Sequence, residues 1–178
     1  MRIVVWITER SWEACVDEVA SLAPAGQPQI VLVAVPEPDV EEVAAGGRAG
    51  LLGRHPPPPR EPTWDAVADA AAKDLLEDAA ARLGRPAAAE VRHGRPEREI
   101  VAACAGADLL ILARDGDDAH LGPRSLGRHA RFVVDHAPCR VLLIWPDGPP
   151  GVETIPPPPE HPPGHEPPPP PGHPPPPG

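Results

Sequence analysis

Residues 108–128 read Asp108-Leu-Leu-Ile-Leu-Ala113 and then Arg114-Asp-Gly-Asp-Asp-Ala-His-Leu-Gly-Pro-Arg-Ser-Leu-Gly-Arg128. The first part is an apolar run without alternation, which predicts a strand buried on both faces of a parallel sheet. The second part carries three glycines among arginines. Glycines let backbone N–H groups converge on an anion, and a helix that starts after them adds partial positive charge. The stretch therefore predicts a strand, an anion-binding loop and a helix.

Four more strands are predicted around this stretch, three from short apolar runs and one, over residues 88–93, from a weaker pattern. They cover residues 2–7, 29–35, 88–93 and 140–145. Helical periodicity and end signals predict helices over residues 12–23, 63–83, 96–106 and 125–136. This alternation indicates a parallel sheet with helices on both faces, in which ligands bind outside the carboxyl ends of the strands. The loops after the first and fourth strands are therefore the expected places for a site.

Two of the helices carry more detailed predictions. Ser11 precedes the first helix and is expected to cap it with its side chain. In the helix that starts at Thr63, an apolar residue recurs every four positions and predicts the buried face. These residues are Val67, Ala71, Leu75, Ala79 and Leu83.

Proline is concentrated at the end of the chain. Of 31 prolines among 178 residues, 18 lie in the last 33, from Pro146 to Gly178. This tail has too few apolar groups to fold, so it is predicted to be a disordered, extended arm that could bind a protein partner. A second Gly- and Pro-rich stretch, residues 39–62, is predicted to be a flexible insertion in a domain that covers residues 1–145.

Charge and cysteine content exclude several classes of protein. The formal net charge of −10 argues against broad nucleic-acid binding. No apolar run approaches the roughly 20 residues that a membrane span needs, so a cytoplasmic protein is predicted. The three cysteines are far apart in apolar surroundings, which predicts reduced, buried thiols rather than disulfides or a metal site.

The sequence resembles the universal stress protein family, in particular its UspA-like domains. The family's nucleotide motif is Gly, two residues, Gly, nine residues, Gly, then Ser or Thr. Three segments that flank this motif are close to the family's usual sequence. Before it lie Gly94-Arg-Pro-Glu-Arg-Glu-Ile100 and Ala107-Asp-Leu-Leu-Ile-Leu112, and after it lies His136-Ala-Pro-Cys-Arg-Val-Leu-Leu-Ile144. The resemblance covers most of residues 2–145. It implies a five-stranded, parallel, doubly wound α/β sheet, Rossmann-like and adenine nucleotide alpha hydrolase-like, with strand order 3-2-1-4-5.

The motif is degenerate in this chain. Nucleotide-binding members usually end the first strand in an Asp near the adenine and ribose, and here that position is Thr8. Ala113 replaces the first Gly, Gly116 matches the second, and Gly127 matches the third only after one extra residue. Arg128 stands where a Ser or Thr would follow, and it could supply a charged contact in place of the hydroxyl.

The resemblance implies a candidate nucleotide site. Its residues are Thr8, Val35, Ala113, Gly116, Gly127 and Arg128. ATP, with Mg²⁺ as its only metal, is a candidate ligand. The alternative for the loop is a solvated connection whose arginines pair with Asp115, Asp117 and Asp118, and the alternative for residues 8–10 is a simple turn. Trp6 is expected either to pack in the core, to plug the adenine pocket or to offer it a stacking face.

Neither a phosphate-binding P-loop nor a nucleophile elbow occurs in the sequence, so no enzymatic activity is predicted. The last strand is an apolar edge, and in this family such a strand commonly pairs antiparallel with its copy. That edge comprises Val141, Leu142, Leu143, Ile144 and Trp145. The prediction is a cytoplasmic, homodimeric regulatory protein of the stress response. The alternative is an ATP-binding switch, which would show measurable ATP affinity.

Overall fold

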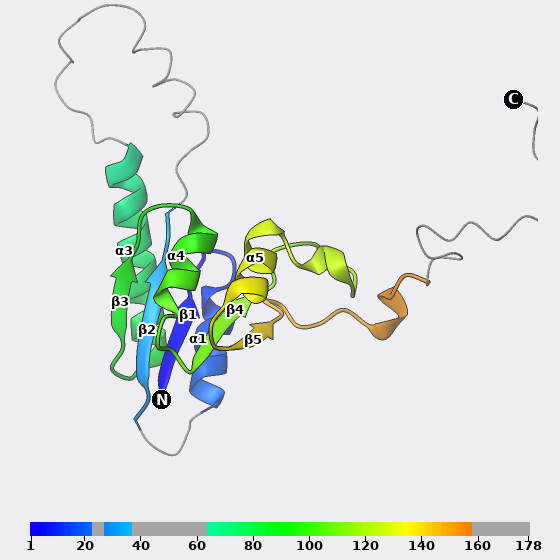
Figure 1. Cartoon of the computed structure of the whole chain (residues 1–178), viewed down its shortest axis with the longest axis horizontal. Helices are drawn as coiled ribbons and strands as arrows, with labels where there is room; N and C mark the ends of the chain where they lie inside the picture. The colour runs from blue at the N-terminus through cyan, green and yellow to red at the C-terminus, as the bar shows by residue number, and fades with distance from the viewer. Residues whose placement is uncertain (23–26, 37–63, 158–178) are drawn as a thin grey trace, which may run out of the picture.

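The computed structural model describes residues 1–22, 27–36 and 64–157. Five strands form one parallel sheet in the order β3-β2-β1-β4-β5 (Figure 1), which confirms the predicted fold class and strand order. The strands are β1 (Arg2–Trp6), β2 (Gln29–Ala34), β3 (Ala88–Val91), β4 (Leu109–Ala113) and β5 (Arg140–Ile144). The α-helices are α1 (Trp12–Ser21), α3 (Trp64–Leu83), α4 (Pro96–Ala103) and α5 (Arg128–His136). Two short 3-10 helices are η1 (Pro123–Ser125) and η2 (Val152–Thr154).

Alternate residues of the central strands point to opposite faces of the sheet, and each face is covered by two helices (Figure 1). Ile3 and Val5 pack with the buried residues of α1 and α3. Val4 packs on the other side, with the buried residues of α4 and α5. The core therefore has two layers, as a doubly wound sheet requires. In the described part of the chain, no helix is long and apolar enough to cross a membrane.

The buried face of α3 differs in part from the predicted one, of which Ala79 and Leu83 are buried as predicted. The side chains that it buries are Ala72, Leu76, Ala79 and Leu83, whereas Val67 is 45% exposed. An α-helix has 3.6 residues per turn, so a repeat of four drifts by about 40° at each step and leaves the buried face after a few steps. Spacings of four, three and four residues keep the observed face toward the sheet.

α1 begins at Trp12 as predicted, but its predicted side-chain cap is wrong, and so is the predicted start of α5. Ser11 makes no side-chain capping bond to α1, because its hydroxyl pairs with that of Thr8 at 2.7 Å. The helix predicted from Ser125 begins at Arg128. Ser125 instead ends η1, where its fully buried hydroxyl donates to the Gly122 carbonyl at 2.7 Å.

The predicted insertion at residues 39–62 lies outside the described residues. The tail predicted to be disordered from Pro146 is described as far as residue 157, and this part contains η2. The rest of the tail lies outside the described residues.

Candidate ligand site

A hollow of about 460 Å³ opens at the carboxyl ends of β1 and β2. This volume is in the range of small-molecule sites, roughly 300–1,000 Å³. Two of the predicted site residues, Thr8 and Val35, line it. Its walls also include Trp6, Arg10, Leu75 and Pro96. The hollow thus lies where a doubly wound sheet binds its ligands.

The turn after β1 holds Thr8 at the rim of the hollow. The Thr8 carbonyl accepts the N–H groups of Ser11 at 3.1 Å and of Trp12 at 3.0 Å. This geometry satisfies the expectation of a strand-to-helix turn. It leaves the Thr8 side chain half-buried, with its hydroxyl bonded to Ser11.

Trp6 is mainly a core residue. It is only 7% exposed and belongs to the cluster that α4 and α5 cover. The small exposed part contributes to the wall of the hollow. Of the three expectations for Trp6, core packing is therefore the one that the structure supports.

The loop after β4 is folded tightly on itself. The Gly116 N–H donates to the Ser125 carbonyl at 3.1 Å, and the Asp117 N–H donates to the Arg124 carbonyl at 2.9 Å. A Cβ on Gly116 would lie only 2.2 Å from the Arg124 carbonyl oxygen. Glycine is required here because the two segments approach too closely for any side chain. The amides of Gly116, which matches the motif, and of its neighbour Asp117 are therefore already bonded within the loop.

The start of α5 is occupied by a carboxylate of the same chain. The Gly127 N–H donates to Asp115 Oδ1 at 2.6 Å, and the Ala130 N–H donates to Asp115 Oδ2 at 3.2 Å. A Cβ on Gly127 would lie 2.9 Å from Asp115 Oδ1, so the absent side chain is what lets the carboxylate reach the helix. Asp115 therefore caps α5 in the place predicted for a phosphate.

Arg128 is exposed at the first turn of α5. Its Nε donates to His129 Nε2 at 3.0 Å, and His129 Nδ1 donates to Glu97 Oε2 at 2.8 Å. The pKa of the Glu97 carboxyl is lowered, mainly by the backbone N–H of Glu97 and to a smaller extent by His129. This chain of contacts ties the start of α5 to the start of α4, whose Pro96 lines the hollow.

The acidic residues of the loop have different partners from those predicted for a solvated connection. Among the ion pairs of the described residues, Asp118 pairs with Arg10 of the turn after β1. This pair bridges the two loops at the edge of the sheet. Asp117 accepts the Ala119 N–H at 2.9 Å and lies 3.0 Å from His120 Nδ1, contacts that lower the pKa of its carboxyl.

A model of the universal stress protein family matches residues 2–144. The chain belongs to this family. No curated protein sequence matches this chain. Among solved structures, it resembles the hypothetical protein MJ0577 with a TM-score of 0.59, at 16% identity over 81% of this chain and 95% of that one. It also resembles a universal stress protein in complex with cAMP (TM-score 0.55, 18% identity, 82% and 97% covered) and universal stress protein UspA from Lactobacillus plantarum (0.51, 19%, 81% and 97%).

Ala113 contributes to this universal stress protein's core rather than to an open surface. It is 8% exposed and packs in the cluster that α1 and α3 cover. The next residue, Arg114, donates through its side chain to Ser125 and lies over the Trp145 ring, 4.6 Å from the ring centroid. Within the described residues, the buried Arg114 Nε has no hydrogen-bond partner. These contacts brace the base of the loop against the end of β5.

The universal stress protein's tail returns to the same loop. The Leu121 N–H donates to Thr154 Oγ1 at 3.0 Å, and Thr154 Oγ1 donates to the Gly151 carbonyl at 2.7 Å. A hollow of about 400 Å³ lies between the loop and the tail, with Arg124 and Pro156 among its lining residues. Sequence reasoning missed this contact, since no motif links residues so far apart.

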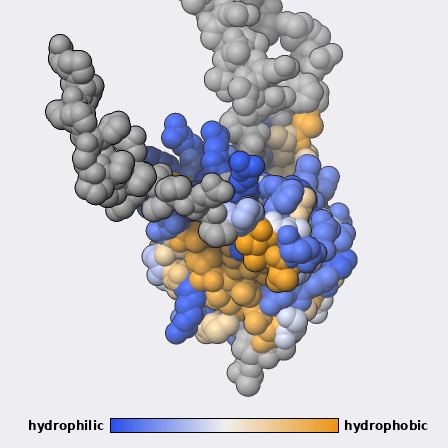
Figure 2. All heavy atoms as spheres, turned by 90° about the vertical axis from the view of Figure 1, so that its right-hand side faces the viewer, coloured by the Kyte–Doolittle hydropathy of each residue, from blue (hydrophilic) through white to orange (hydrophobic). Residues whose placement is uncertain are grey.

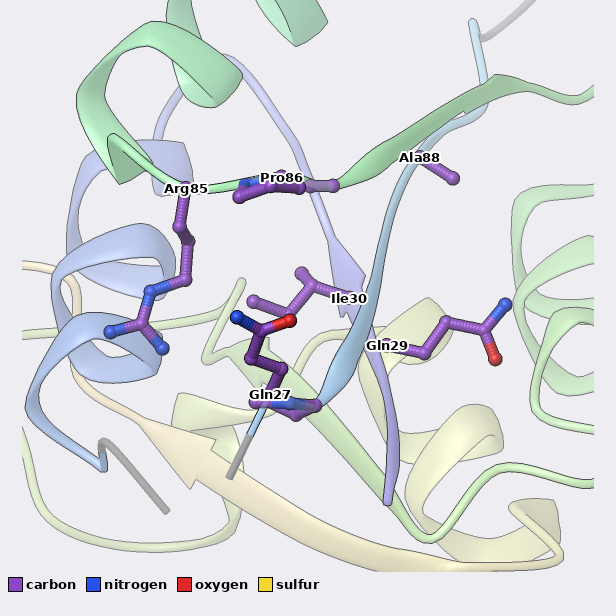
Figure 3. Close-up of a pocket in the computed structure, with 8 residues that line it drawn as sticks. Gln27, Gln29, Ile30, Arg85, Pro86 and Ala88 are labelled. Carbon is purple, nitrogen blue, oxygen red and sulfur yellow. The ribbon is translucent and has the colours of Figure 1, made fainter. Parts of the chain in front are cut away.

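Another hollow, of about 660 Å³, lies at the amino ends of β2 and β3. Figure 3 shows Gln27 and Arg85 on the side of β2 to which Ile30 points, and Gln29 on the other side. No predicted site residue lines this hollow, and it is at the opposite end of the strands from the expected ligand edge. It is therefore separate from the candidate site.

The cysteines of the universal stress protein are free in the structure. Burial raises the pKa of the Cys15 thiol to about 12, and burial and the neighbouring Cys139 raise the pKa of Cys104 to about 12. Both are neutral at physiological pH. Among residues 1–22, 27–36 and 64–157, no group of His, Cys, Asp or Glu side chains is arranged to hold a metal ion.

Proposed function

We propose that this universal stress protein is a non-enzymatic, cytoplasmic regulator of the stress response that forms a homodimer through β5 and has a degenerate nucleotide site. The observation that carries the dimer is the exposure of β5. Residues 141–144 are all half-buried, whereas Ile3–Trp6 of β1 are buried. Figure 2 looks at the side of the molecule on which β5 lies and shows a broad hydrophobic area there.

The other edge of the sheet supports this choice of interface. The edge strand β3 carries Ala88, Ala89 and Glu90, and the Glu90 carboxylate pairs with Arg92 at 2.9 Å. Small and charged residues discourage pairing with another strand, whereas Val141 and Leu143 on β5 are apolar and do not discourage it. Antiparallel pairing of two β5 strands would bury the apolar edge and satisfy its free backbone groups in a two-fold dimer.

Sedimentation of the full chain tests the dimer. The double variant Val141→Glu/Leu143→Glu places four carboxylates at the two-fold seam and should sediment as a folded monomer. The matched control Ala89→Glu adds the same kind of charge to the opposite edge and should remain a dimer. Circular dichroism checks that each variant is folded. A wild-type chain that sediments as a monomer at every attainable concentration would refute the proposal, independently of the variants.

The chemistry of the nucleophiles supports a non-enzymatic role. A thiol with a pKa of about 12 has almost no thiolate at neutral pH, which applies to Cys15 and Cys104. Lys73 is exposed on α3 and is not among the residues that line the hollow. Incubation with MgATP should release no ADP, AMP or phosphate above the protein-free rate.

An ATP-dependent switch is the second candidate function. The hollow beside Thr8 and Val35 favours it, and so does the similar fold of a universal stress protein solved in complex with cAMP. Calorimetry with MgATP should then give a micromolar constant that weakens about tenfold in Arg128→Ala, which corresponds to about 1.4 kcal/mol. Arg98→Ala is the matched control, because this arginine is also exposed at the first turn of a helix. Absence of ATP binding would exclude the switch and leave the dimeric regulator, whose Pro-rich tail would bind a protein partner.

A further inference from the structure

We infer that Asp115 is an internal anion that keeps phosphate away from the start of α5, so that the site accepts an uncharged adenine nucleoside in preference to a nucleotide. The inference rests on the proposed nucleotide-type site and names its ligand class. It makes Asp115 the residue that determines specificity at this edge of the sheet.

The first argument is that both carboxylate oxygens are engaged. Oδ1 accepts the Gly127 N–H at 2.6 Å, and Oδ2 accepts the Ala130 N–H at 3.2 Å. The amino end of a helix carries partial positive charge and unsatisfied N–H groups, which is why it attracts anions. In this chain the anion is supplied by the protein itself. A phosphate at the same place would have to displace Asp115, or it would lie beside a like charge.

The second argument is that two further amides of the loop are engaged and that the loop is closed where they lie. The amides of Gly116 and Asp117 are bonded to carbonyls of Ser125 and Arg124. The backbone at Gly116 is so close to Arg124 that even a methyl group would overlap it. The loop is therefore a closed hairpin-like structure rather than an open cradle, and its closure is independent of the carboxylate.

The third argument concerns the charge of the hollow. Two charged residues line it, Glu9 and Arg10, and the positive charge of Arg10 is paired with Asp118. Much of the remaining wall is apolar, with Val35 and Leu75 among its residues, and the Thr8 hydroxyl is a polar group at the rim. Such a lining suits an uncharged ring with a few hydroxyls better than a polyanion.

Calorimetry with adenosine and with MgATP on the full chain tests the inference. Three proteins are compared: wild type, Asp115→Ala and the control Asp135→Ala, which removes the same charge from the exposed C-terminal part of α5. Wild type should bind adenosine at least about tenfold more tightly than MgATP, and Asp135→Ala should match wild type within about threefold for each ligand. Asp115→Ala should bind MgATP at least about tenfold more tightly than wild type does, with unchanged affinity for adenosine.

A second probe separates this inference from the proposed site. Tripolyphosphate contains no nucleoside, and its binding is followed by the amide NMR signals of Gly127 and Ala130. These signals should shift in Asp115→Ala and not in wild type. If adenosine fails to bind any of the proteins, the proposed site and the nucleoside preference are both wrong, whereas a shift confined to Asp115→Ala would still support the exclusion of phosphate. Tight MgATP binding by wild type, or equal tripolyphosphate shifts in both proteins, would overturn the inference and leave the site intact.

Discussion

The hollow beside β1 and β2 and the loop after β4 lie at the same edge of the sheet, but they differ in what they leave open. The hollow has a volume of about 460 Å³ and an apolar wall. The loop has its amides bonded internally and its helix start capped by Asp115. The two halves of a binding site can therefore change separately. A carboxylate at a helix start can close one half without altering the fold that forms the other.

The largest effect is expected for Gly116→Ala, which breaks the closed loop. Its Cβ would lie 2.2 Å from the Arg124 carbonyl oxygen and 2.8 Å from the Ser125 carbonyl carbon, so the backbone must move. We expect a loss of about 3 kcal/mol in the free energy of unfolding, measured by urea denaturation. Gly106→Ala is the control. Nothing lies within 4 Å of its Cβ, and its positive φ of 72° should cost about 1 kcal/mol. Equal losses in the two variants would contradict the tight packing of the loop.

The next effect sharpens the other half of the site. Thr8→Asp returns a carboxylate to the rim of the hollow, where it can accept hydrogen bonds from ribose hydroxyls. Adenosine affinity should rise about tenfold in calorimetry, or about 1.4 kcal/mol. Thr8→Asn keeps the shape without the charge and should gain less than half of this free energy. An unchanged affinity in Thr8→Asp would show that the ligand does not reach Thr8.

A smaller effect is expected where the tail braces the loop. Thr154→Val keeps the side-chain volume but removes the oxygen that accepts the Leu121 N–H at 3.0 Å. The free energy of unfolding of the loop should fall by about 1 kcal/mol, and hydrogen exchange of the Leu121 amide should become about fivefold faster. Ile155→Val is the control, because Ile155 is 57% exposed in the same segment. Unaltered exchange at Leu121 would mean that the tail does not hold the loop in solution.

The smallest effect concerns the contact that joins α4 and α5. The pKa of Glu97 is lowered from its ordinary value of 4.5 by its own backbone N–H and by His129. A depressed pKa contributes stability that is fully present above the unfolded pKa and is lost as the pH falls through the folded pKa. Glu97→Gln should therefore have a free energy of unfolding, obtained from thermal melts, that depends less on pH below about 4.5 than that of wild type, by a few tenths of a kcal/mol. If the stability of the two proteins changes equally with pH across this range, Glu97 does not contribute to the pH dependence.

Local patterns explain why most of the fold could be predicted. Runs such as Ile3–Trp6 and Leu109–Ala113 have no polar residue, and such runs are buried on both sides of a parallel sheet. The start of α5 was predicted too early, because Ser125 resembles a capping residue while its hydroxyl is buried in η1. The buried face of α3 was misplaced because a repeat of four does not follow one face of a helix. Both errors concern choices that packing makes among several acceptable local patterns.

The candidate site was only partly visible in the sequence. The family resemblance implied Thr8 and Val35, which follow the first two strands, and both line one hollow. The role of Asp115 was not visible, since its partners Gly127 and Ala130 become neighbours only when the loop closes. The same is true of the bond between Leu121 and Thr154, which requires the tail to return after β5.

The order of apolar runs and glycines was enough to predict the family, the parallel sheet and the edge at which a ligand is expected. These properties depend on hydrophobic burial and on chain direction, both of which follow from the order of the residues. Whether the anion-binding groups of that edge are free was decided by the tertiary structure. A backbone N–H has the same appearance in any sequence, and its availability depends on which acceptor the folded chain brings within hydrogen-bond distance.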